Sequence, residues 1–495
     1  MDLDEGFYGG SFGELDDYGG IAGAMESHRQ ALLKATTALQ GGTTYVTDPP
    51  SLTGGGALRM QSIEPILQRT IPTDEHFPFY NRIAQSDANP VDEYTVYDDI
   101  GGFLGGSFQG EIDDIVETEG NYERKVLRVK IMATMRQISL FLENQKSFIE
   151  VQGNEALGAI SVLKRDCNYN MYYGDETVVP NEFNGLEKAI LDKNDPELII
   201  DAGGEGLDSG GGEILSLSRA IHDDGRFGLA TDLWCSPLVQ LHEFDRKLDP
   251  SIRVSLNSIG PAGIMLGTPV PGVRAGRGPV KNNEDIFIKE GQAPWEGASA
   301  KLQARVVALA LTPATIASTV AATGTAANKF QAKHAGLYYW GVEATSRKGN
   351  APTAVSAQVA VAAGQKVTFT ITNPADANVT GYIIHRSRKN GANAKSDLRK
   401  MVRIPRTAGA TTVYVDENQN VPGTSTVFVG DFRPSDTGIN LRRMGTMRRF
   451  ALYPTNKLMR PWAHFFFAGL RVSKPLHFGM VRNVLPGGAL WKPFN

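Results

Sequence analysis

The feature that most constrains this fold is a pair of strand-like runs separated by a long polar excursion. Alternating apolar and polar residues at 94–97 and 126–131 predict two strands. The intervening stretch, residues 101–120, is acidic and dotted with glycine. Two strands joined in this way form an extended hairpin arm, which is too thin to have a hydrophobic core of its own. The chain therefore needs another surface on which this arm can pack.

Charge is segregated along the chain, although it nearly balances overall. The 495 residues include 50 Lys and Arg against 54 Asp and Glu, for a net charge of −4. Residues 87–119 contain ten acids and no base, whereas residues 431–495 contain eleven Lys and Arg and two Asp. Segregated blocks of this kind suit a protein that meets copies of itself or a charged polymer. Solvated faces and loops explain the same pattern equally well.

Several classes of protein are excluded by composition. The densest apolar segment, residues 464–470, is far too short to cross a bilayer, so no membrane association is expected. The acidic N-terminus cannot be the basic front of a signal peptide. Cys167 and Cys235 are the only cysteines, which leaves no disulfide framework and favours a reducing compartment.

No constellation of residues in the sequence supports catalysis or metal binding. The eight histidines are scattered, and none has a metal-type partner at three to five residues. Residues 9–13 match the G-x-S-x-G pattern, but no strand can precede a serine so near the terminus. We therefore predict no catalytic, cofactor-binding or metal-binding residues, no cofactor, and a protein that is not an enzyme.

The middle of the chain alternates between helical and strand patterns. Apolar residues at three- and four-residue spacing predict one long amphipathic helix that ends at Gly174; they are Leu157, Ile160, Leu163, Cys167 and Met171. Cys167 lies on this apolar stripe and is interpreted as a buried small residue. A short strand is predicted at 198–200. Ser236 and Pro237 then begin a second helix, whose stripe is Leu238, Leu241, Phe244 and Leu248.

The composition shifts near residue 302 and remains rich in Ala, Thr and Val to about 429. Short alternating runs in this region are separated by turn residues every ten to fifteen positions or so, which is typical of a small β-sandwich. The α/β pattern resumes near Asp431, so the sandwich is an inserted module. We expect it to project outward and to be removable without loss of assembly.

Particular phrases of the sequence resemble the major capsid proteins of tailed bacteriophages. The long helix ends in Tyr-Gly-Asp at 173–175, followed by Glu-Phe-Asn-Gly-Leu at 182–186. A strand, Cys-Ser-Pro at 235–237 and a helix resemble the central domain of that family, and Leu-Tyr-Pro-Thr-Asn at 452–456 resembles its closing segment. In the insert, residues 335–344 and 381–387 are similar to strands of Ig-like and fibronectin type III modules.

The resemblance implies an α+β protein with the Hong Kong 97-type capsid fold and an inserted all-β, Ig-like or fibronectin type III-like sandwich. The expected divisions are residues 1–87 for an N-terminal arm, 88–137 for an extended E-loop with its flanking strands, 138–190 for a peripheral domain with the spine helix, 191–301 for the first part of an axial domain, 302–429 for the sandwich, and 430–495 for the return to the axial and peripheral domains.

The function implied by the resemblance is that of a major capsid protein, which self-assembles into the icosahedral head of a tailed bacteriophage around packaged double-stranded DNA. The expected partners are other copies in hexamers and pentamers, portal, scaffold and decoration proteins, and DNA contacted without sequence preference. The expected location is the virion, after synthesis in the bacterial host cytoplasm. Two alternatives remain open: the shell protein of an encapsulin-like compartment, and a sandwich-bearing phage tail or adhesin protein.

Charged residues near the hairpin and in the C-terminal block are the candidate contact residues. The candidate subunit-contact residues are Glu111, Asp113, Asp114, Glu117, Glu119, Arg124, Lys125, Arg128 and Lys130. The residues expected to face either a neighbouring subunit or DNA are Arg442, Arg443, Arg448 and Arg449. One hypothesis is that the acidic stretch docks on these arginines in a neighbour, where opposite charges would set register and encounter rate. The rival hypothesis places the arginines against DNA phosphates.

Overall fold

A computed structural model describes residues 74–494, all within one compact unit, Thr70–Asn495. Its gaps are at residues 103–104, 112–114, 116, 145–150, 209–210, 224, 247–269, 276–277, 289–314, 322–323, 326, 347–348, 394, 436–437 and 455–457. The predicted N-terminal arm before residue 74 and the motif at 9–13 lie outside the described residues.

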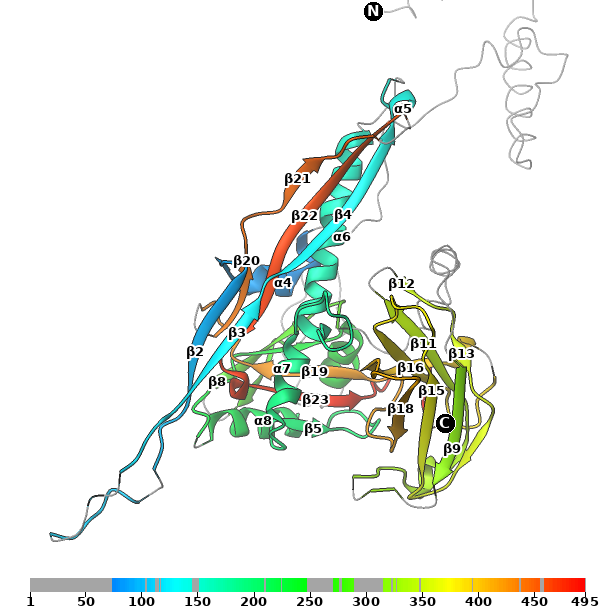
Figure 1. Ribbon diagram of the computed structural model, residues 1–495. Helices are drawn as coiled ribbons and strands as arrows, with labels where there is room; N and C mark the ends of the chain where they lie inside the picture. The colour runs from blue at the N-terminus through cyan, green and yellow to red at the C-terminus, as the bar shows by residue number, and fades with distance from the viewer. Residues whose placement is uncertain are drawn as a thin grey trace, which may run out of the picture. The chain divides into compact units, whose positions relative to one another are not determined.

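The predicted hairpin is present and is continuous with a long sheet (Figure 1). Strand β2 (Val91–Asp99) pairs antiparallel with β3 (Asn121–Arg128). After a single residue the chain enters β4 (Lys130–Ser139), which pairs over its whole length with β22 (Met459–Val472). The run predicted as one strand at 126–131 is therefore divided between the arm and the sheet.

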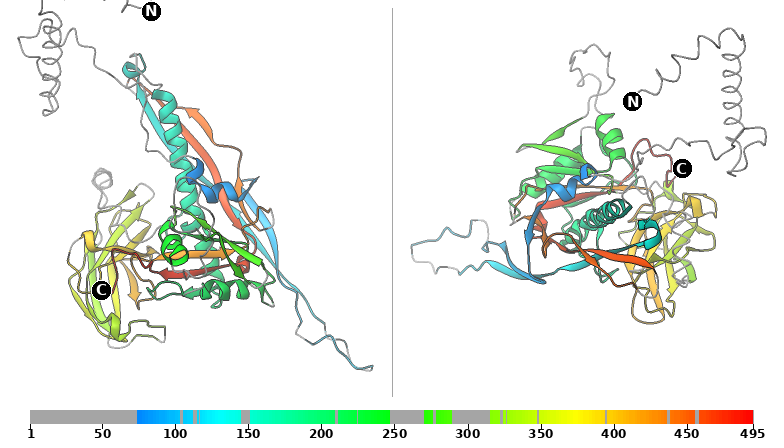
Figure 2. Two further views of the ribbon diagram at one scale, coloured as in Figure 1. Left: turned by 180° about the vertical axis from the view of Figure 1, so that it is seen from behind. Right: turned by 90° about the horizontal axis from the view of Figure 1, so that it is seen from above.

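The second edge of β22 carries two consecutive strands, β20 (Ile439–Arg443) and β21 (Arg448–Ala451). β1 (Ala84–Asp87) extends the sheet by pairing parallel with β20. The short helix α5 (Leu140–Asn144) follows β4 at the far end of the sheet. Figure 2 shows from two further directions that the long helix follows the same sheet.

The long helix α6 (Val151–Tyr173) confirms the helix predicted from the apolar spacing. Leu163, Cys167 and Met171 of the predicted stripe are buried and Ile160 is partly buried, whereas Leu157 is 51% exposed, so its predicted burial is wrong. The helix ends at Gly174, where an added Cβ would lie 2.2 Å from the carbonyl oxygen of Phe183. Only glycine fits this close approach of two backbone segments.

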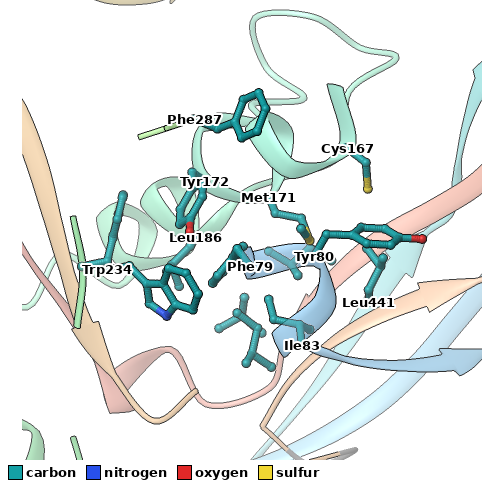
Figure 3. Packing of buried hydrophobic residues seen from close by; sticks show 14 of the residues in the cluster. Phe79, Tyr80, Ile83, Cys167, Met171, Tyr172, Leu186, Trp234, Phe287 and Leu441 are labelled. Carbon is teal, nitrogen blue, oxygen red and sulfur yellow. The ribbon is translucent and has the colours of Figure 1, made fainter. Parts of the chain in front are cut away.

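The core beneath α6 is aromatic (Figure 3). Helix α4 (Pro78–Arg82) contributes Phe79, whose ring stacks on Tyr172 of α6 with centroids 4.2 Å apart. The edge of the same ring meets Trp234 at 5.1 Å. Pairs of this kind add about 0.5–1.5 kcal/mol to the free energy that burial provides. The start of the described chain is thus anchored to the helix and to the neighbouring sheet.

A second, mixed sheet of six strands contains the central part of the chain. Its strands, in spatial order, are β5 (Ile199–Asp201), β23 (Phe478–Val484), β19 (Ser425–Gly430), β6 (Asp232–Cys235), β8 (Gly278–Glu284) and β7 (Gly272–Ala275). Helix α8 (Gly212–His222) packs on β19 and β23, and α7 (Leu186–Lys193) lies against β23 and α6. β5 confirms the predicted short strand.

The second predicted helix is present but changes its pitch. The Ser236 hydroxyl caps α9 (Pro237–Val239) by accepting the amide of Val239 at 3.4 Å. The chain then continues as a π-helical turn, η3 (Gln240–Asp245). Because the π turn inserts an extra residue, Leu241 leaves the apolar stripe and is 48% exposed, so its predicted burial is wrong. Leu248 lies outside the described residues.

The insert is an all-β sandwich of two main sheets. One sheet has the order β12 (Gly349–Asn350), β11 (Trp340–Ser346), β16 (Gly381–Arg386), β17 (Arg399–Pro405), with β13 (Ala354–Val355) also on β11. The other has β18 (Thr411–Asp416), β15 (Lys366–Thr372) and β9 (Thr315–Ala321), and β10 (Gly336–Tyr338) pairs with β14 (Val359–Val361). Single turns η2 (Asp74–His76), η5 (Ala332–His334), η6 (Lys395–Asp397) and η7 (Pro475–His477) complete the described elements.

The position of β19 shows where the C-terminal end of the insert differs from the expected one. It pairs with β6 and β23 of the six-stranded sheet, not with the sandwich. The expected boundary at 429 is therefore one strand too late, and we propose that the insert ends before Ser425. The β-branched and aromatic residues at 426–429 suit either sheet, so the pattern could not assign the strand.

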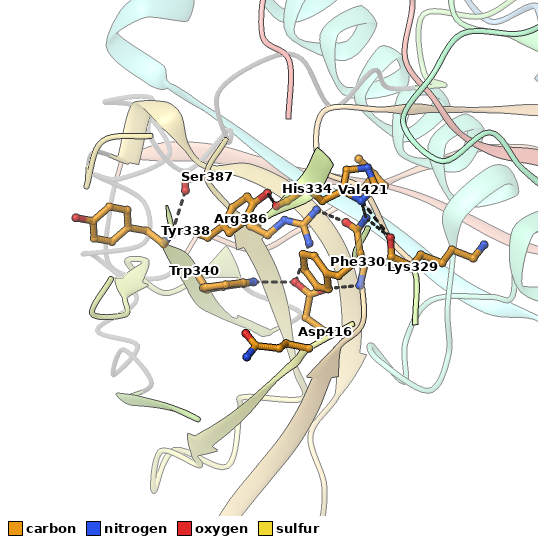
Figure 4. A network of polar contacts seen from close by, with 12 residues as sticks. Lys329, Phe330, His334, Tyr338, Trp340, Arg386, Ser387, Asp416 and Val421 are labelled. Carbon is orange, nitrogen blue, oxygen red and sulfur yellow. Dashed lines mark hydrogen bonds and ion pairs between the residues drawn. The ribbon is translucent and has the colours of Figure 1, made fainter. Parts of the chain in front are cut away.

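A buried ion pair lies in the core of the sandwich (Figure 4). Arg386 Nη1 donates to Asp416 Oδ2 at 2.9 Å, and both side chains are fully buried. The Trp340 indole N–H donates to the same oxygen at 2.9 Å, and Arg386 Nη2 donates to Asn418 at 2.7 Å. These hydrogen bonds compensate for the removal of both charges from water.

Removing one member of this pair should destabilise the sandwich strongly. We expect Asp416→Ala to lower the free energy of unfolding by about 3–5 kcal/mol, because it leaves the Arg386 charge buried without its partner. Chemical denaturation followed by tryptophan fluorescence measures the change. The control is Thr411→Ala at an exposed position of the same strand, where about 0.5 kcal/mol or less is expected. Equal effects of the two substitutions would contradict this account.

A second buried pair in the sandwich is neutral. His385 Nε2 and Glu343 Oε2 are 3.1 Å apart, and both side chains are fully buried. Burial raises the pKa of Glu343 to about 9, against the lowering effects of Asn350 and Lys400. Burial, with a smaller contribution from Lys400, lowers the pKa of His385 to about 3. At neutral pH the protonated carboxyl therefore donates to the neutral imidazole.

Because of the Glu343–His385 pair, we expect the sandwich to lose stability as pH rises above neutrality. Between the ordinary glutamate pKa of 4.5 and about 9, unfolding releases the Glu343 proton, so rising pH favours the unfolded state. Below pH 6.5 the depressed pKa of His385 acts in the opposite direction. We expect the thermal midpoint to fall from pH 7 to 9 in the parent chain and less steeply in Glu343→Gln, as measured by calorimetry. Parallel curves would refute the assignment.

Candidate subunit interface

The loop of the hairpin exposes acidic and apolar side chains together. Glu111, Glu117 and Glu119 are exposed, while Asp113 and Asp114 lie outside the described residues. Phe108 is 90% exposed and Ile115 is 85% exposed. Exposed apolar side chains concentrated in one segment mark a contact surface. The arm therefore presents both kinds of group to whatever it meets.

Basic residues at the hairpin base are mostly used within the chain. Arg124 forms an ion pair with Glu93 on the paired strand, and Lys125 lies 3.2 Å from Glu123. Arg128 is exposed.

Lys130 is directed inward, contrary to its expected role as a subunit contact. Its Nζ donates to Glu176 Oε1 at 2.7 Å and to the carbonyl oxygen of Pro180 at 2.8 Å, and its side chain is 15% exposed. The residue holds the start of β4 against the loop after α6. Its position beside an exposed arm could not reveal this role, because the loop that it contacts is distant in the sequence.

Two of the four C-terminal arginines are also engaged inside the subunit. Arg442 Nε donates to Asp92 Oδ2 at 2.8 Å, and Arg471 lies 3.4 Å from the same carboxylate. Arg443 donates to Gln85 at 2.8 Å and lies 3.6 Å from Asp87. Half of the hypothesised basic cluster therefore ties the base of the hairpin and β1 to the long sheet.

The other two arginines lie on opposite faces of the edge strand β21. Arg449 is opposite His464 and stacks over the Trp462 ring, with its guanidinium carbon 4.8 Å from the ring centroid. Arg448 is opposite Phe465, one residue along β22, and so faces the other way. Both are exposed. The four arginines do not form one surface.

The sheet face that carries Arg448 is apolar and uncovered by the described chain. Helix α6 packs on the opposite face, where Trp462 and Phe466 are buried. On the uncovered face Ile131 is 68% exposed, Met135 58% and Phe450 57%. We call these three side chains, with the partly buried Phe465 and Phe467, the outer sheet face. The sequence prediction missed this surface, although the alternation along 131–135 was the signal that could have found it.

The inserted sandwich is docked on the rest of the chain. Arg403 of β17 donates to Glu182 at 3.0 Å, and Lys400 donates to the Tyr169 hydroxyl of α6 at 3.3 Å. Lys329 forms an ion pair with Asp201 of β5. The side chains of Arg403 and Glu182 are mostly buried, so these contacts are more than a solvated surface attraction.

The C-terminal segment adds a second set of contacts with the sandwich. The Trp491 indole donates to Asp397 Oδ1 at 3.1 Å, and Arg399 stacks over the Trp491 ring at 5.1 Å. Phe494 stacks on His334 with centroids 4.0 Å apart. Loss of the insert would expose the apolar rings of the C-terminal segment. These contacts count against the expectation that the insert is removable without loss of assembly, which stays a prediction.

Substitution of Trp491 should loosen this docking. We expect Trp491→Ala to lower the unfolding free energy by about 3–5 kcal/mol, as is typical when a buried large aromatic is truncated. Hydrogen exchange should also increase at 331–338 and 396–399. The matched control is Leu490→Ala, because Leu490 is 101% exposed. Similar exchange in both variants would contradict the docking role.

The described residues were also compared with the requirements of a metal site and of a membrane-spanning helix. In this part of the chain no group of three or more His, Cys, Asp or Glu side chains is placed to hold a metal ion. Among the helices of the described residues, none combines the length and the hydropathy that a bilayer span requires.

The chain is similar in sequence to curated phage proteins over nearly its whole length. It is 23% identical over 460 residues to the major capsid protein of Staphylococcus phage S25-3, which covers 89% of this chain and 93% of that protein. The major capsid protein of Staphylococcus phage K matches with the same identity and coverage. No family profile matches the chain. The resemblance to phage major capsid proteins is therefore confirmed.

Comparison with solved structures finds capsids at low similarity. The capsid of a native GTA particle aligns with a TM-score of 0.45 and 10% identity, over 89% of this chain and 100% of the other. A chain from Mycobacterium phage Adephagia aligns with a TM-score of 0.41 and 8% identity, over 86% and 95%. The expected α+β class is confirmed by the hairpin, long helix and six-stranded sheet described above, and the Ig-like identity of the sandwich stays a prediction.

Proposed function

We propose that this protein is a major capsid protein, which self-assembles into the icosahedral head of a tailed bacteriophage around packaged double-stranded DNA. The observation that carries the proposal is the correspondence with phage major capsid proteins over 89% of the chain and 93% of the relative. A match of this extent covers most of both chains, so it concerns the whole subunit and not one shared module.

The geometry supports self-assembly because two surfaces need a partner. The hairpin has exposed apolar groups and no core, and the outer sheet face leaves apolar side chains in water. Repeated contacts between copies would cover both surfaces. Many modest interfaces add through effective concentration, and closed symmetry completes the shell.

Further partners follow from this function. Copies would form hexamers and pentamers, and the finished head would also contact portal, scaffold and decoration proteins. Exposed basic residues, including Arg128 and Arg448, would meet either a neighbour or DNA phosphates. The role is structural and not catalytic, the protein is made in the host cytoplasm, and its final location is the virion.

Electron microscopy of the purified protein tests this proposal. Closed shells of uniform diameter, which contain DNA when isolated from infected cells, are the expected result. Shells that hold a protein cargo and no genome would indicate a compartment protein instead. Fibres or small rings would indicate a tail component or an adhesin, and either result would overturn the proposal.

Charge on the outer sheet face should block assembly without unfolding the subunit. We expect Ile131→Glu with Met135→Glu to reduce shell yield by about tenfold or more, since each apolar side chain contributes about 1.5–3 kcal/mol when buried. Sedimentation measures the yield, and circular dichroism verifies the fold. The control, Ile131→Leu with Met135→Leu, keeps the surface apolar and should assemble normally. Normal yield from the glutamate variant would exclude this face as an interface.

A further inference from the structure

The two sheets of the inserted sandwich differ in what their outer faces meet. Lys400 and Arg403 of β17 contact α6 and the loop after it, so the outer face of the sheet that contains β17 is docked on the rest of the subunit. The sheet of β18, β15 and β9 lies on the other side of the sandwich core, in which the ring centroids of Phe369 and Trp340 are 5.0 Å apart (Figure 1). Its outer face is therefore turned away from the docked one.

Strand register brings threonine and valine together on this second outer face. Alternate residues of β15, from Val367 to Ile371, are fully buried, so the residues between and beyond them lie on the outer face. Each of these has a directly paired position on β18 and on β9. We call the nine positions the threonine face: Thr368, Thr370 and Thr372 of β15, Thr411, Val413 and Val415 of β18, and Thr315, Ala317 and Thr319 of β9.

The threonine face is uncharged and open to solvent on β18. Val413 is 56% exposed and Val415 is 41% exposed. Thr372 and Thr411, which pair at one end of the face, are exposed as well. None of the nine positions holds a charged or aromatic residue, and the first charged outward residue of β15 is Lys366, at the end of the strand. The face thus offers no cation to a phosphate and no ring on which a nucleobase could stack.

We propose that the threonine face packs against the same face of the insert in a second copy of this chain. In a contact generated by a two-fold axis, each group near the axis meets its own copy, so charged groups repel and uncharged groups do not. A threonine hydroxyl both donates and accepts, so identical faces can hydrogen-bond to each other. The exposed valines would leave water when the two faces pack about 10 Å apart, as the sheets of a sandwich do.

The size of the threonine face makes this contact weak by itself. Three strands about 4.8 Å apart, each about six residues long at about 3.3 Å per residue, cover roughly 300 Å². Two such faces would bury about 600 Å² in total, against the roughly 1,200 Å² at the lower end of stable interfaces. The inference therefore rests on the proposed function, because many copies held in one shell give such a contact the high effective concentration that it needs.

Site-directed cross-linking of the full chain tests the contact. Both native cysteines are buried, so a short bis-maleimide reacts selectively with the thiol that Thr370→Cys introduces at the centre of the face. We expect covalent dimers from Thr370→Cys in assembled shells and, at lower yield, in the concentrated unassembled chain. The matched control is Ala377→Cys, at an exposed position in the loop between β15 and β16, where the yield should be lower by about tenfold or more.

A charge placed on the threonine face should abolish the cross-link. We expect Val413→Lys, added to Thr370→Cys, to reduce the dimer yield by about tenfold or more, because each copy would bring a like charge to the contact. Ala377→Lys, outside the face, should leave the yield unchanged. The yield from Thr370→Cys should also be equal at low and high salt, since salt screens charged contacts. Thermal unfolding of each variant verifies that it is folded.

Several outcomes would overturn this inference. These are no dimers in either state, equal cross-linking through Thr370→Cys and Ala377→Cys, no effect of Val413→Lys, or dimers that disappear at high salt. A Thr370→Cys thiol that is protected from labelling in shells from infected cells, but gives no dimer, would place another virion protein on the face and would also overturn it. Electron microscopy scores shell formation separately: shells without dimers would refute only this inference, whereas dimers in fibres without shells would refute the proposed function.

Discussion

The pairing of β4 with β22 is the interaction on which the rest of the structure depends. Ten consecutive positions pair between a strand that follows the hairpin and a strand near the C-terminus. This pairing provides the surface that α6 covers, sets the direction in which the hairpin leaves, and places β20 and β21 on the opposite edge. Because the partners are distant in sequence, this pairing requires closure of a very long loop, in contrast to the pairing of β21 with β22, whose partners are near in sequence.

The charges of the chain divide into two groups with different uses. One group stabilises the subunit: Asp92 accepts Arg442 and lies near Arg471, and Lys130 binds the loop after α6. The other group stays at the surface, in the acidic loop and on β21. The near-neutral total therefore hides two kinds of pairing, one completed within the subunit and one that we propose involves a neighbouring copy or DNA.

Local periodicity predicted the elements whose burial follows a simple pattern. The helix α6, the hairpin strands and the all-β insert were each predicted from spacing and turn residues, and each is present, although Leu157 of the predicted α6 stripe is exposed. The prediction was wrong where tertiary context decides: the π turn exposes Leu241, and β19 joins the central sheet. The roles of Lys130 and Arg442 were also missed, because the partner of a long charged side chain depends on which segments the fold brings together.

By itself, the sequence determined that a thin hairpin must find a surface, that a long helix would bury one face, and that an all-β module interrupts the chain. Those features depend on the spacing of apolar and turn residues that are near one another in the chain, which can be read directly from the sequence. Only the tertiary structure decided which arginines remain exposed, which sheet face stays uncovered, and which residues of the insert share the threonine face. These depend on strand register, because a shift of one residue moves every side chain to the other face.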